Sequence, residues 1–327
     1  MWNSAKSRLV TGIVLFTGIV AFSGGCANKE QAVNLYVDAV MLAEQGQNNQ
    51  ALDRLNEAVR INKKFSLAYS LLGDVYAKLA EYEKSAAAYE QATQLNPWSF
   101  KDHFGLGKVY EVMDNFADAV KAYARACELD PEHFEAHLSA AKTYYKLKDY
   151  GSAMVYGERA EQINANSPDV HELFGDIYET QQDYTRAIDS YKRALEVDSN
   201  DADVMASLGV IYLKTGRIGP ANELLKNAVR IAPSPFIYKH LGYSYLKLAE
   251  FDNAIEGYKK AIELDSGNWD AHRGLGVAYI LKGRDEDGYV EEEMRKLAVQ
   301  HWNLSLDINP TQPNRNGLEK YINIYSR

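Results

Sequence analysis

The sequence has few cysteines, few prolines and no excess of basic residues. Its 327 residues include two cysteines and eight prolines, so a proline-rich disordered chain is excluded. Hydrophobic residues at 46% and charged residues at 25% are typical of a folded protein. Acidic residues outnumber basic ones by 45 to 36, which gives a net charge of −9. A nucleic-acid binder needs a basic face to displace counterions from phosphates, so no nucleic-acid partner is expected.

The first 25 residues have the pattern of an export signal. Lys6 and Arg8 precede an uncharged, mostly apolar run over residues 9–22. As a helix this run would span about 21 Å, which is short of the roughly 30 Å hydrocarbon core of a bilayer. A signal peptide therefore fits better than a membrane span.

The end of that run, Ser23-Gly24-Gly25-Cys26, resembles a bacterial lipobox, in which a small residue precedes the cysteine that becomes the acylated N-terminus. The resemblance implies a diacylglyceryl thioether on Cys26, and two or more acyl chains anchor stably in a membrane. Ser23 departs from the leucine that the motif prefers, so an ordinary secretory signal or a weak N-terminal anchor remains the alternative. The residue after the cysteine is Ala27, whereas an acidic residue there would be a signal for retention in the inner membrane. This favours the periplasmic face of the outer membrane over that of the inner membrane.

The remaining cysteine, Cys127, has no disulfide partner if Cys26 is lipidated. It follows Ala126 and precedes Glu128 and Leu129, with no basic neighbour to stabilise a thiolate. We therefore interpret it as a small packing residue inside a helix.

An internal repeat runs along the rest of the chain. A small residue is followed three places later by an aromatic residue or leucine, and successive pairs are 34 residues apart except for one step of 33. A second set of small and large residues follows at fixed distances, with spacings of three and four that define one helical face. Small residues let two helix backbones approach closely. The pairs are Ala39/Leu42, Gly73/Tyr76, Gly107/Tyr110, Ala141/Tyr144, Gly175/Tyr178, Gly209/Tyr212, Gly242/Tyr245 and Gly276/Tyr279.

This pattern resembles the tetratricopeptide repeat (TPR) family over residues 32–310. The resemblance implies an all-α fold, an α-solenoid forming a right-handed superhelix of about eight helix-turn-helix repeats, with the first helix of each unit lining a concave groove. After the signal peptide (1–25) and a short linker (26–31), the expected units are 32–65, 66–99, 100–133, 134–167, 168–201, 202–234, 235–268 and 269–310.

Two units depart from the pattern, and one helix follows the array. Gly157 replaces the large residue in the second helix of the fourth unit, so looser packing is expected there. The eighth unit has an acidic insertion near residues 284–293, which we interpret as a solvated helix extension, with a docking edge for a basic partner as the alternative. Residues 311–327 contain an amphipathic helix (316–326) that is expected to cap the exposed end of the solenoid.

Histidines are the first candidates for catalysis or metal binding. Four of the seven recur at the fourth place of a unit, which favours helix packing. The pair His133 and His137 could share a metal, but Glu135 is displaced from the general-base place of a zinc protease. No phosphate-binding loop or nucleophile elbow is present. No enzyme activity, cofactor or metal is expected, and a metal-dependent hydrolase is the alternative. The recurring residues are His103, His137, His171 and His272.

The concave groove is therefore the candidate site. In the TPR family the second, fifth, ninth, twelfth and thirteenth places of a unit tend to face it. Aromatic and arginine anchors carry much of the binding energy at such surfaces. A solvated face of mixed charge is the alternative to a peptide groove. The candidate residues are Lys101, Phe104, Lys108, Leu138, Lys142, Tyr145, Val210, Leu213, Lys239, Tyr243, Arg273 and Val277.

These features together predict a lipid-anchored scaffold of the bacterial cell envelope that binds partner proteins or peptides. A pilotin-like assembly factor for a secretin or pilus, and an adapter for an exopolysaccharide export complex, are alternatives within the family. The carboxylate clamp of chaperone-binding relatives needs lysine and asparagine on one first helix and asparagine on the next. After Lys239, the two asparagine places hold Tyr243 and Gly274, so the clamp is absent.

Overall fold

The computed structural model describes residues 24–326, which form seventeen α-helices and contain no β-strand. The predicted all-α fold of paired helices is therefore confirmed. The expected signal peptide lies almost entirely outside the described residues. Within the described part of the chain, no helix is both long and apolar enough to cross a bilayer.

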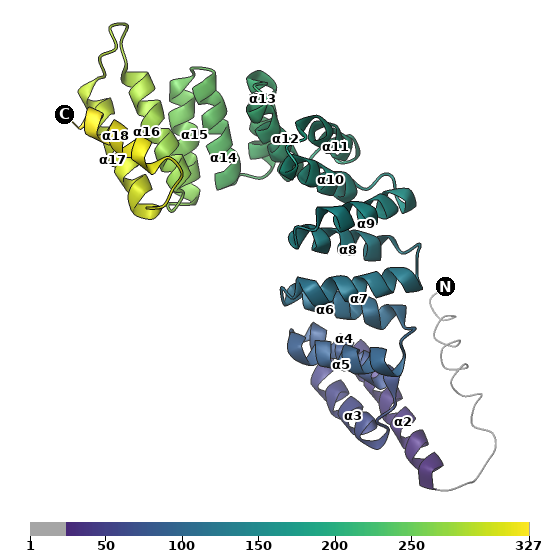
Figure 1. Cartoon of the computed structure of the whole chain (residues 1–327). Coiled ribbons are helices and arrows are strands. Elements are labelled where there is room, and N and C mark those ends of the chain that lie inside the picture. The colour runs from purple at the N-terminus through teal and green to yellow at the C-terminus, as the bar shows by residue number, and fades with distance from the viewer. Residues whose placement is uncertain (1–23, 327) are drawn as a thin grey trace. The chain divides into compact units, whose positions relative to one another are not determined.

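The chain divides into two compact units, between Asp149 and Tyr150. In both, consecutive helices run antiparallel as hairpins (Figure 1). The first unit contains α2 (Gly24–Glu44), α3 (Asn48–Ile61), α4 (Ser66–Lys78), α5 (Tyr82–Leu95), α6 (Phe100–Val112), α7 (Phe116–Leu129) and α8 (Phe134–Lys146). The second contains α9 (Tyr150–Ile163), α10 (Pro168–Thr180), α11 (Tyr184–Val197), α12 (Ala202–Lys214), α13 (Ile218–Ile231), α14 (Pro235–Lys247), α15 (Phe251–Leu264), α16 (Trp269–Gly283), α17 (Glu292–Ile308) and α18 (Arg315–Tyr325).

In six of the hairpins a large residue of the second helix packs on a glycine of the first. The ring of Tyr191 on α11 is fully buried and lies against Gly175 on α10. A Cβ atom added to Gly175 would lie 2.5 Å from Tyr191 Cε1. Gly107 and Tyr123 form the same contact between α6 and α7. The small residues of the sequence repeat therefore mark the closest approach of two helices.

Replacing Gly175 with alanine should lower the free energy of unfolding by about 1–3 kcal/mol, because the new methyl group overlaps the buried tyrosine ring. Gly219 on α13 is the matched control, since a Cβ there meets nothing within 4 Å. Gly219→Ala should be neutral or stabilise by about 0.4–1 kcal/mol. Chemical denaturation followed by circular dichroism measures both, and equal effects would contradict the close-approach interpretation.

The turn inside a hairpin contains one residue in the left-handed conformation, which reverses the chain direction in few residues. Glycine occupies this place at Gly46 and Gly216, but larger residues occupy the others. The sequence pattern did not mark these turns, because glycine is not required there. The non-glycine residues are Ala80, Asp114, Lys148, Gln182 and Ala249, with φ between 55° and 61°.

The structure differs from two sequence expectations. Residues 26–31 belong to helix α2 and are not a linker, since the helical repeat pattern beginning at Ala32 continues upstream through helix-forming residues. The acidic insertion is not a helix extension but a short hairpin closed by an antiparallel bridge between Arg284 and Val290. Gly288, with φ of +85°, turns this hairpin, and the Asp285 carboxylate accepts a hydrogen bond from Tyr289 N at 2.8 Å.

At Gly157 on α9 the chain makes a close contact with the following helix, α10. The ring of Phe174 on α10, which is 5% exposed, fills the space beside it. A Cβ on Gly157 would lie 2.7 Å from Phe174 Cε1. The large residue that the fourth repeat lacks on α9 is thus supplied by the following helix.

Helix α18 packs on the last hairpin of the second unit. Leu318 is 5% exposed within the apolar cluster of α15, α16 and α17. Trp302 on α17, which is 2% exposed, lies beside Tyr321 and Tyr325, with ring centroids 6.0 and 5.9 Å apart. Helix α18 therefore covers an apolar surface that the last hairpin would otherwise expose to water.

Candidate functional site

Six of the twelve predicted groove residues line one cavity in the second unit. They are Val210 and Leu213 on α12, Lys239 and Tyr243 on α14, and Arg273 and Val277 on α16. The cavity has a volume of about 890 Å³. Three successive first helices thus present their predicted positions to one shared space.

The cavity also contains residues that the groove assignment left out. Tyr258 on α15 and Trp302 on α17 reach it between the first helices. Helix α18 closes one side, although the sequence suggested only a capping role for it. The amphipathic spacing of that helix was visible in the sequence, but which groove it borders depends on tertiary packing. The further lining residues are Lys214, His240, Leu246, Lys247, Asp270, Gly274, Leu281, Asn314, Leu318 and Tyr321.

The other six predicted residues lie in the first unit and are occupied by contacts within the chain. Lys101 Nζ is 2.5 Å from the Asp74 carboxylate. The Phe104 ring lies 5.7 Å from that of Tyr123, and Lys108 Nζ is 5.4 Å above Phe104. On α8, Leu138 is 5% exposed and belongs to the core, and Lys142 and Tyr145 are half-buried.

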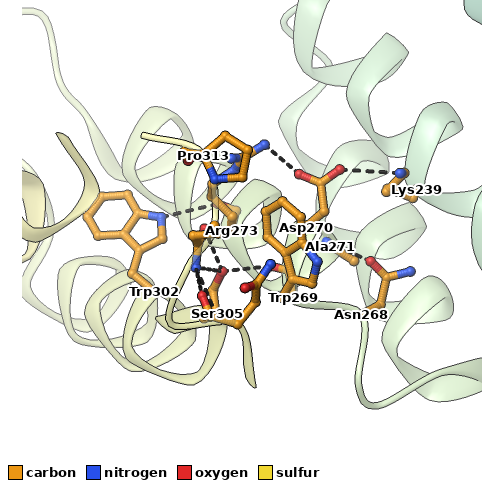
Figure 2. A network of polar contacts seen from close by, with 11 residues as sticks. Lys239, Asn268, Trp269, Asp270, Ala271, Arg273, Trp302, Ser305 and Pro313 are labelled. Atoms are coloured by element: carbon orange, nitrogen blue, oxygen red, sulfur yellow. Dashed lines mark hydrogen bonds and ion pairs between the residues drawn. The ribbon is translucent and has the colours of Figure 1, made fainter. Parts of the chain in front are cut away.

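One carboxylate sits between two cations at the mouth of the cavity. Asp270 Oδ2 is 3.2 Å from Lys239 Nζ, and Asp270 Oδ1 is 2.5 Å from Arg273 Nη2 (Figure 2). Arg273 Nη1 also donates to the carbonyl of Pro313, 3.5 Å away, and its backbone carbonyl accepts from Trp302 Nε1 at 3.1 Å. This network ties α14, α16 and α17 to the segment that leads into α18.

The cavity is basic although the whole chain is acidic. Its lining includes Lys214, Lys239, Lys247 and Arg273, against the single carboxylate of Asp270. The rest of the lining is mainly aliphatic and aromatic. Such a surface favours ligands that combine apolar groups with negative charge.

Two histidines of the second unit are held neutral. Burial, reinforced by nearby Lys239, lowers the pKa of His240 to about 4. Burial, reinforced by His272 and Lys259, lowers the pKa of His301 to about 4. The His272 and His301 Nδ1 atoms are 2.9 Å apart, so one ring must donate to the other. His240 and His301 therefore stay uncharged at neutral pH.

Acidification should destabilise the second unit. An unfolded histidine titrates near pH 6.5, so between about pH 6.5 and pH 4 the unfolded chain binds protons that folded His240 and His301 do not. Stability is therefore lost as the pH falls through this window, by about 2 kcal/mol per histidine between pH 7 and pH 5. Denaturant titrations at both pH values measure this loss. His301→Gln should reduce it, and an unchanged pH dependence in that variant would contradict the assignment.

The recurring histidines have a structural role. His103 Nε2 donates to Pro97 O at 3.2 Å, His137 Nε2 to Pro131 O at 3.2 Å, and His171 Nε2 to Ala165 O at 3.0 Å. Each acceptor lies six residues earlier, in the turn between two repeats. The imidazole at the fourth place of a repeat thus links the first helix of that repeat, by a hydrogen bond, to the turn that precedes it.

His133 and His137 were the pair considered for a metal. His133 is the N-cap of α8, where its Nδ1 accepts a hydrogen bond from Ala136 N at 3.2 Å. Its ring packs against both Phe100 and Phe104, with centroids 4.5 and 5.2 Å away. With His137 directed at Pro131, the two imidazoles serve separate structural contacts.

The thiol of Cys127 is buried, and burial raises its pKa to about 12. A thiol with this pKa is not a nucleophile at neutral pH, which agrees with a packing role. Cys26 lies in the first turn of α2, and its side chain lies outside the described residues.

Comparison with known families agrees with this architecture of stacked helix pairs. A family described as "TPR repeat" matches residues 39–80, 175–216 and 242–283, and two described as "Tetratricopeptide repeat" match residues 104–168 and 66–97. The fold and its repeated hairpins define a helical-repeat protein. The chain belongs to the tetratricopeptide repeat family, whose members bind proteins or peptides and whose fold is typically a non-catalytic scaffold.

Solved structures share the fold at low sequence identity. A chain of the APC/C hetero-tetramer Cut9-Hcn1 is 16% identical over 90% of this chain, with a TM-score of 0.60, and this chain spans 55% of its length. PilF of Pseudomonas aeruginosa is 17% identical, covering 68% of this chain and 96% of its own, with a TM-score of 0.58. PilW, described as a widely conserved type IV pilus biogenesis factor, is 16% identical over 67% of this chain and 98% of its own, with a TM-score of 0.57. No curated protein matches the chain significantly.

Proposed function

We propose that this protein is a non-catalytic scaffold, anchored by lipid in the bacterial cell envelope, that holds a partner protein in the cavity of its second unit. The observation that carries the binding proposal is the convergence of six predicted groove residues on one cavity of about 890 Å³. That volume accommodates several side chains of a partner segment. The polar groups at its mouth are held in place by the Asp270 network, so the site is formed before a partner arrives.

The anchoring proposal is supported by the sequence at the N-terminus. A basic start, an apolar run and a small residue before Cys26 are the elements of a lipoprotein signal. The acylated cysteine would become the first residue of helix α2, so the lipid would adjoin the first repeat. The periplasmic face of the outer membrane is the proposed location.

Lipidation is tested by metabolic labelling of the full chain with an alkyne fatty acid in a bacterial host. The wild-type chain should label and sediment with membranes, and Cys26→Ala should abolish the label. Cys127→Ala is the matched control and should keep it, since that thiol is buried inside a helix. A label that survives Cys26→Ala would refute the anchor without affecting the binding proposal.

A second candidate function is an assembly factor for a pilus or secretin. The observation that favours it is the shared fold with PilF and PilW, the latter described as a type IV pilus biogenesis factor. Affinity capture from solubilised membranes discriminates the two functions. Recovery of pilus or secretin subunits through the cavity would support the assembly role, and recovery of other envelope proteins would support the general scaffold.

A further inference from the structure

A lysine–carboxylate pair recurs between neighbouring repeats. The lysine is the last residue of the first helix of one repeat, and the glutamate lies at the twelfth place of the preceding repeat. Lys146 Nζ is 2.9 Å from Glu111, and Lys214 Nζ is 2.7 Å from Glu179. The two lysine side chains are 45% and 44% exposed, so both pairs lie at a similar depth.

A tyrosine–carboxylate hydrogen bond recurs in the same region. Tyrosine at the large-residue place of a second helix reaches through to the groove side and donates to a first-helix carboxylate. Tyr89 Oη is 2.5 Å from Asp74, Tyr123 Oη is 2.9 Å from Glu111, and Tyr191 Oη is 2.7 Å from Asp176. The tyrosine hydroxyl of a repeat therefore normally has its own acceptor in the chain.

The seventh repeat has the lysine without its carboxylate partner, as does the second repeat, where Lys78 ends α4 and Ala43 stands at the carboxylate's place. Lys247 ends α14, just as Lys214 ends α12 and Lys146 ends α8. In the preceding repeat, Leu213 stands at the twelfth place, which Glu111 and Glu179 occupy in theirs. Among the described residues no carboxylate forms an ion pair with Lys247, whose Nζ lies 5.4 Å above the Tyr243 ring.

The same repeat keeps the tyrosine but has lost both of its acceptors. Tyr258 packs over Gly274, with a Cβ there 2.5 Å from its Cε1, as Tyr89 packs over Gly105. The places of the acceptor carboxylates are Tyr243 and Leu246. Tyr258 is 3% exposed and lines the cavity, and its hydroxyl has no hydrogen-bond partner among the described residues.

A helix C-terminus alone does not explain this arrangement. A lysine there interacts favourably with the helix dipole, which accounts for Lys247. It does not account for leucine replacing glutamate at Leu213, or for the Tyr258 hydroxyl left without an acceptor. A cavity that has these donors without their carboxylates contains polar groups that a ligand carboxylate can satisfy, since hydrogen bonds to charged groups are stronger than those between neutral groups.

We propose that the cavity receives the side-chain carboxylate of an internal glutamate or aspartate of a partner protein, flanked on both sides by apolar residues. The carboxylate takes the place that glutamate or aspartate fills in the other repeats, within reach of Lys247 or Tyr258. This inference rests on the proposed scaffold function and specifies the partner segment. The excess of cations over Asp270 in the lining provides the charge complementarity.

The apolar lining indicates an internal acidic residue and not a free chain end. Val210 and Leu213 on α12 lie to one side of α14, and Val277 and Leu281 on α16 lie to the other. A segment lying across the three helices therefore meets apolar surface before and after the donors of the seventh repeat. A C-terminal carboxylate would leave one of these two surfaces empty.

The test restores the missing carboxylate in the chain itself. Leu213→Glu should form the ion pair with Lys247 that Glu179 forms with Lys214, and so exclude the ligand. Leu264→Glu is the matched control, because Leu264 on α15 is 52% exposed and does not line the cavity. Lys247→Gln combined with Tyr258→Phe removes the donors by a second route if Leu213→Glu does not fold.

The probe is a display library of random heptapeptides with both ends fused or blocked, selected on the detergent-solubilised full chain. Selected peptides should share an acidic residue between apolar ones. By calorimetry the best peptide should lose at least tenfold in affinity when its acid becomes glutamine, or when the chain carries Leu213→Glu, but not with Leu264→Glu. Selection of peptides without an acid, or equal affinity for Leu213→Glu, would overturn the inference.

Other occupants give distinct results. Self-association that depends on concentration and disappears in Leu213→Glu would assign the cavity to a second copy of the chain and overturn the partner assignment. A photo-cross-linking residue in place of Val277 separates the two proposals: if a partner cross-links there with equal yield in Leu213→Glu, the acidic segment is wrong and the scaffold function stands. If nothing cross-links there at all, the scaffold function itself fails.

Discussion

Trp302→Ala should lower the free energy of unfolding of the C-terminal repeats by about 3–5 kcal/mol, the usual cost of truncating a buried tryptophan. The Trp302 side chain is 2% exposed and packs on Gly276, Tyr321 and Tyr325. Its Nε1 also donates to Arg273 O. The substitution therefore leaves a cavity and removes the surface on which α18 packs.

The loss should be local, because a repeat in a solenoid contacts only its neighbours. Hydrogen exchange should show faster opening of α16, α17 and α18, with α10 and α11 unchanged. Trp98→Ala is the matched control, since Trp98 is 75% exposed and its ring contacts Arg125 at 5.0 Å. That variant should change stability by less than about 1 kcal/mol. Equal losses in the two variants would show that Trp302 does not fix the end of the array.

Tyr243→Ala should weaken partner binding by about 30-fold, or about 2 kcal/mol, as expected for an aromatic anchor in a partly enclosed site. Tyr243 lies in the middle of the cavity lining, is 38% exposed, and carries Lys247 above its ring. Its removal takes away contact area and leaves Lys247 less well placed.

Tyr289→Ala is the control for this variant. Tyr289 is 66% exposed on the acidic hairpin and does not line the cavity. Calorimetry with the selected peptide or a captured partner measures both affinities, and circular dichroism verifies that helicity is kept. Equal affinity of Tyr243→Ala and the wild type would move the search for the binding surface to the convex face.

The fold could be predicted because the same residue types recur at fixed positions of each repeat. Gly175 and Tyr191 illustrate this, since each type recurs where two helices meet most closely. The acidic hairpin could not be predicted in the same way, because it occurs once and has no periodic pattern. Its shape depends on a left-handed Gly288 and on the Asp285 side chain, which are local features.

The candidate site was half predictable for a related reason. Family positions identify which side chains face the groove, and the six candidate residues of the second unit are apolar, aromatic or basic and converge on the cavity. In the first unit the same positions are satisfied internally, as Lys101 is by Asp74. Whether a groove cation is free for a ligand depends on its neighbour one repeat away, and Leu213 beside Lys247 shows that the decisive residue can be the one that is missing.

Site-specific photocrosslinking in living cells tests the central claim most directly. A benzoylphenylalanine in place of Val277, inside the cavity, should give a discrete adduct with a partner protein, and the same residue in place of Leu264 on α15 should give none. Leu213→Glu should suppress the Val277 adduct. Adducts of equal intensity from both positions, or an adduct from position 264 alone, would contradict a scaffold that holds its partner in the cavity of α12, α14, α16 and α18.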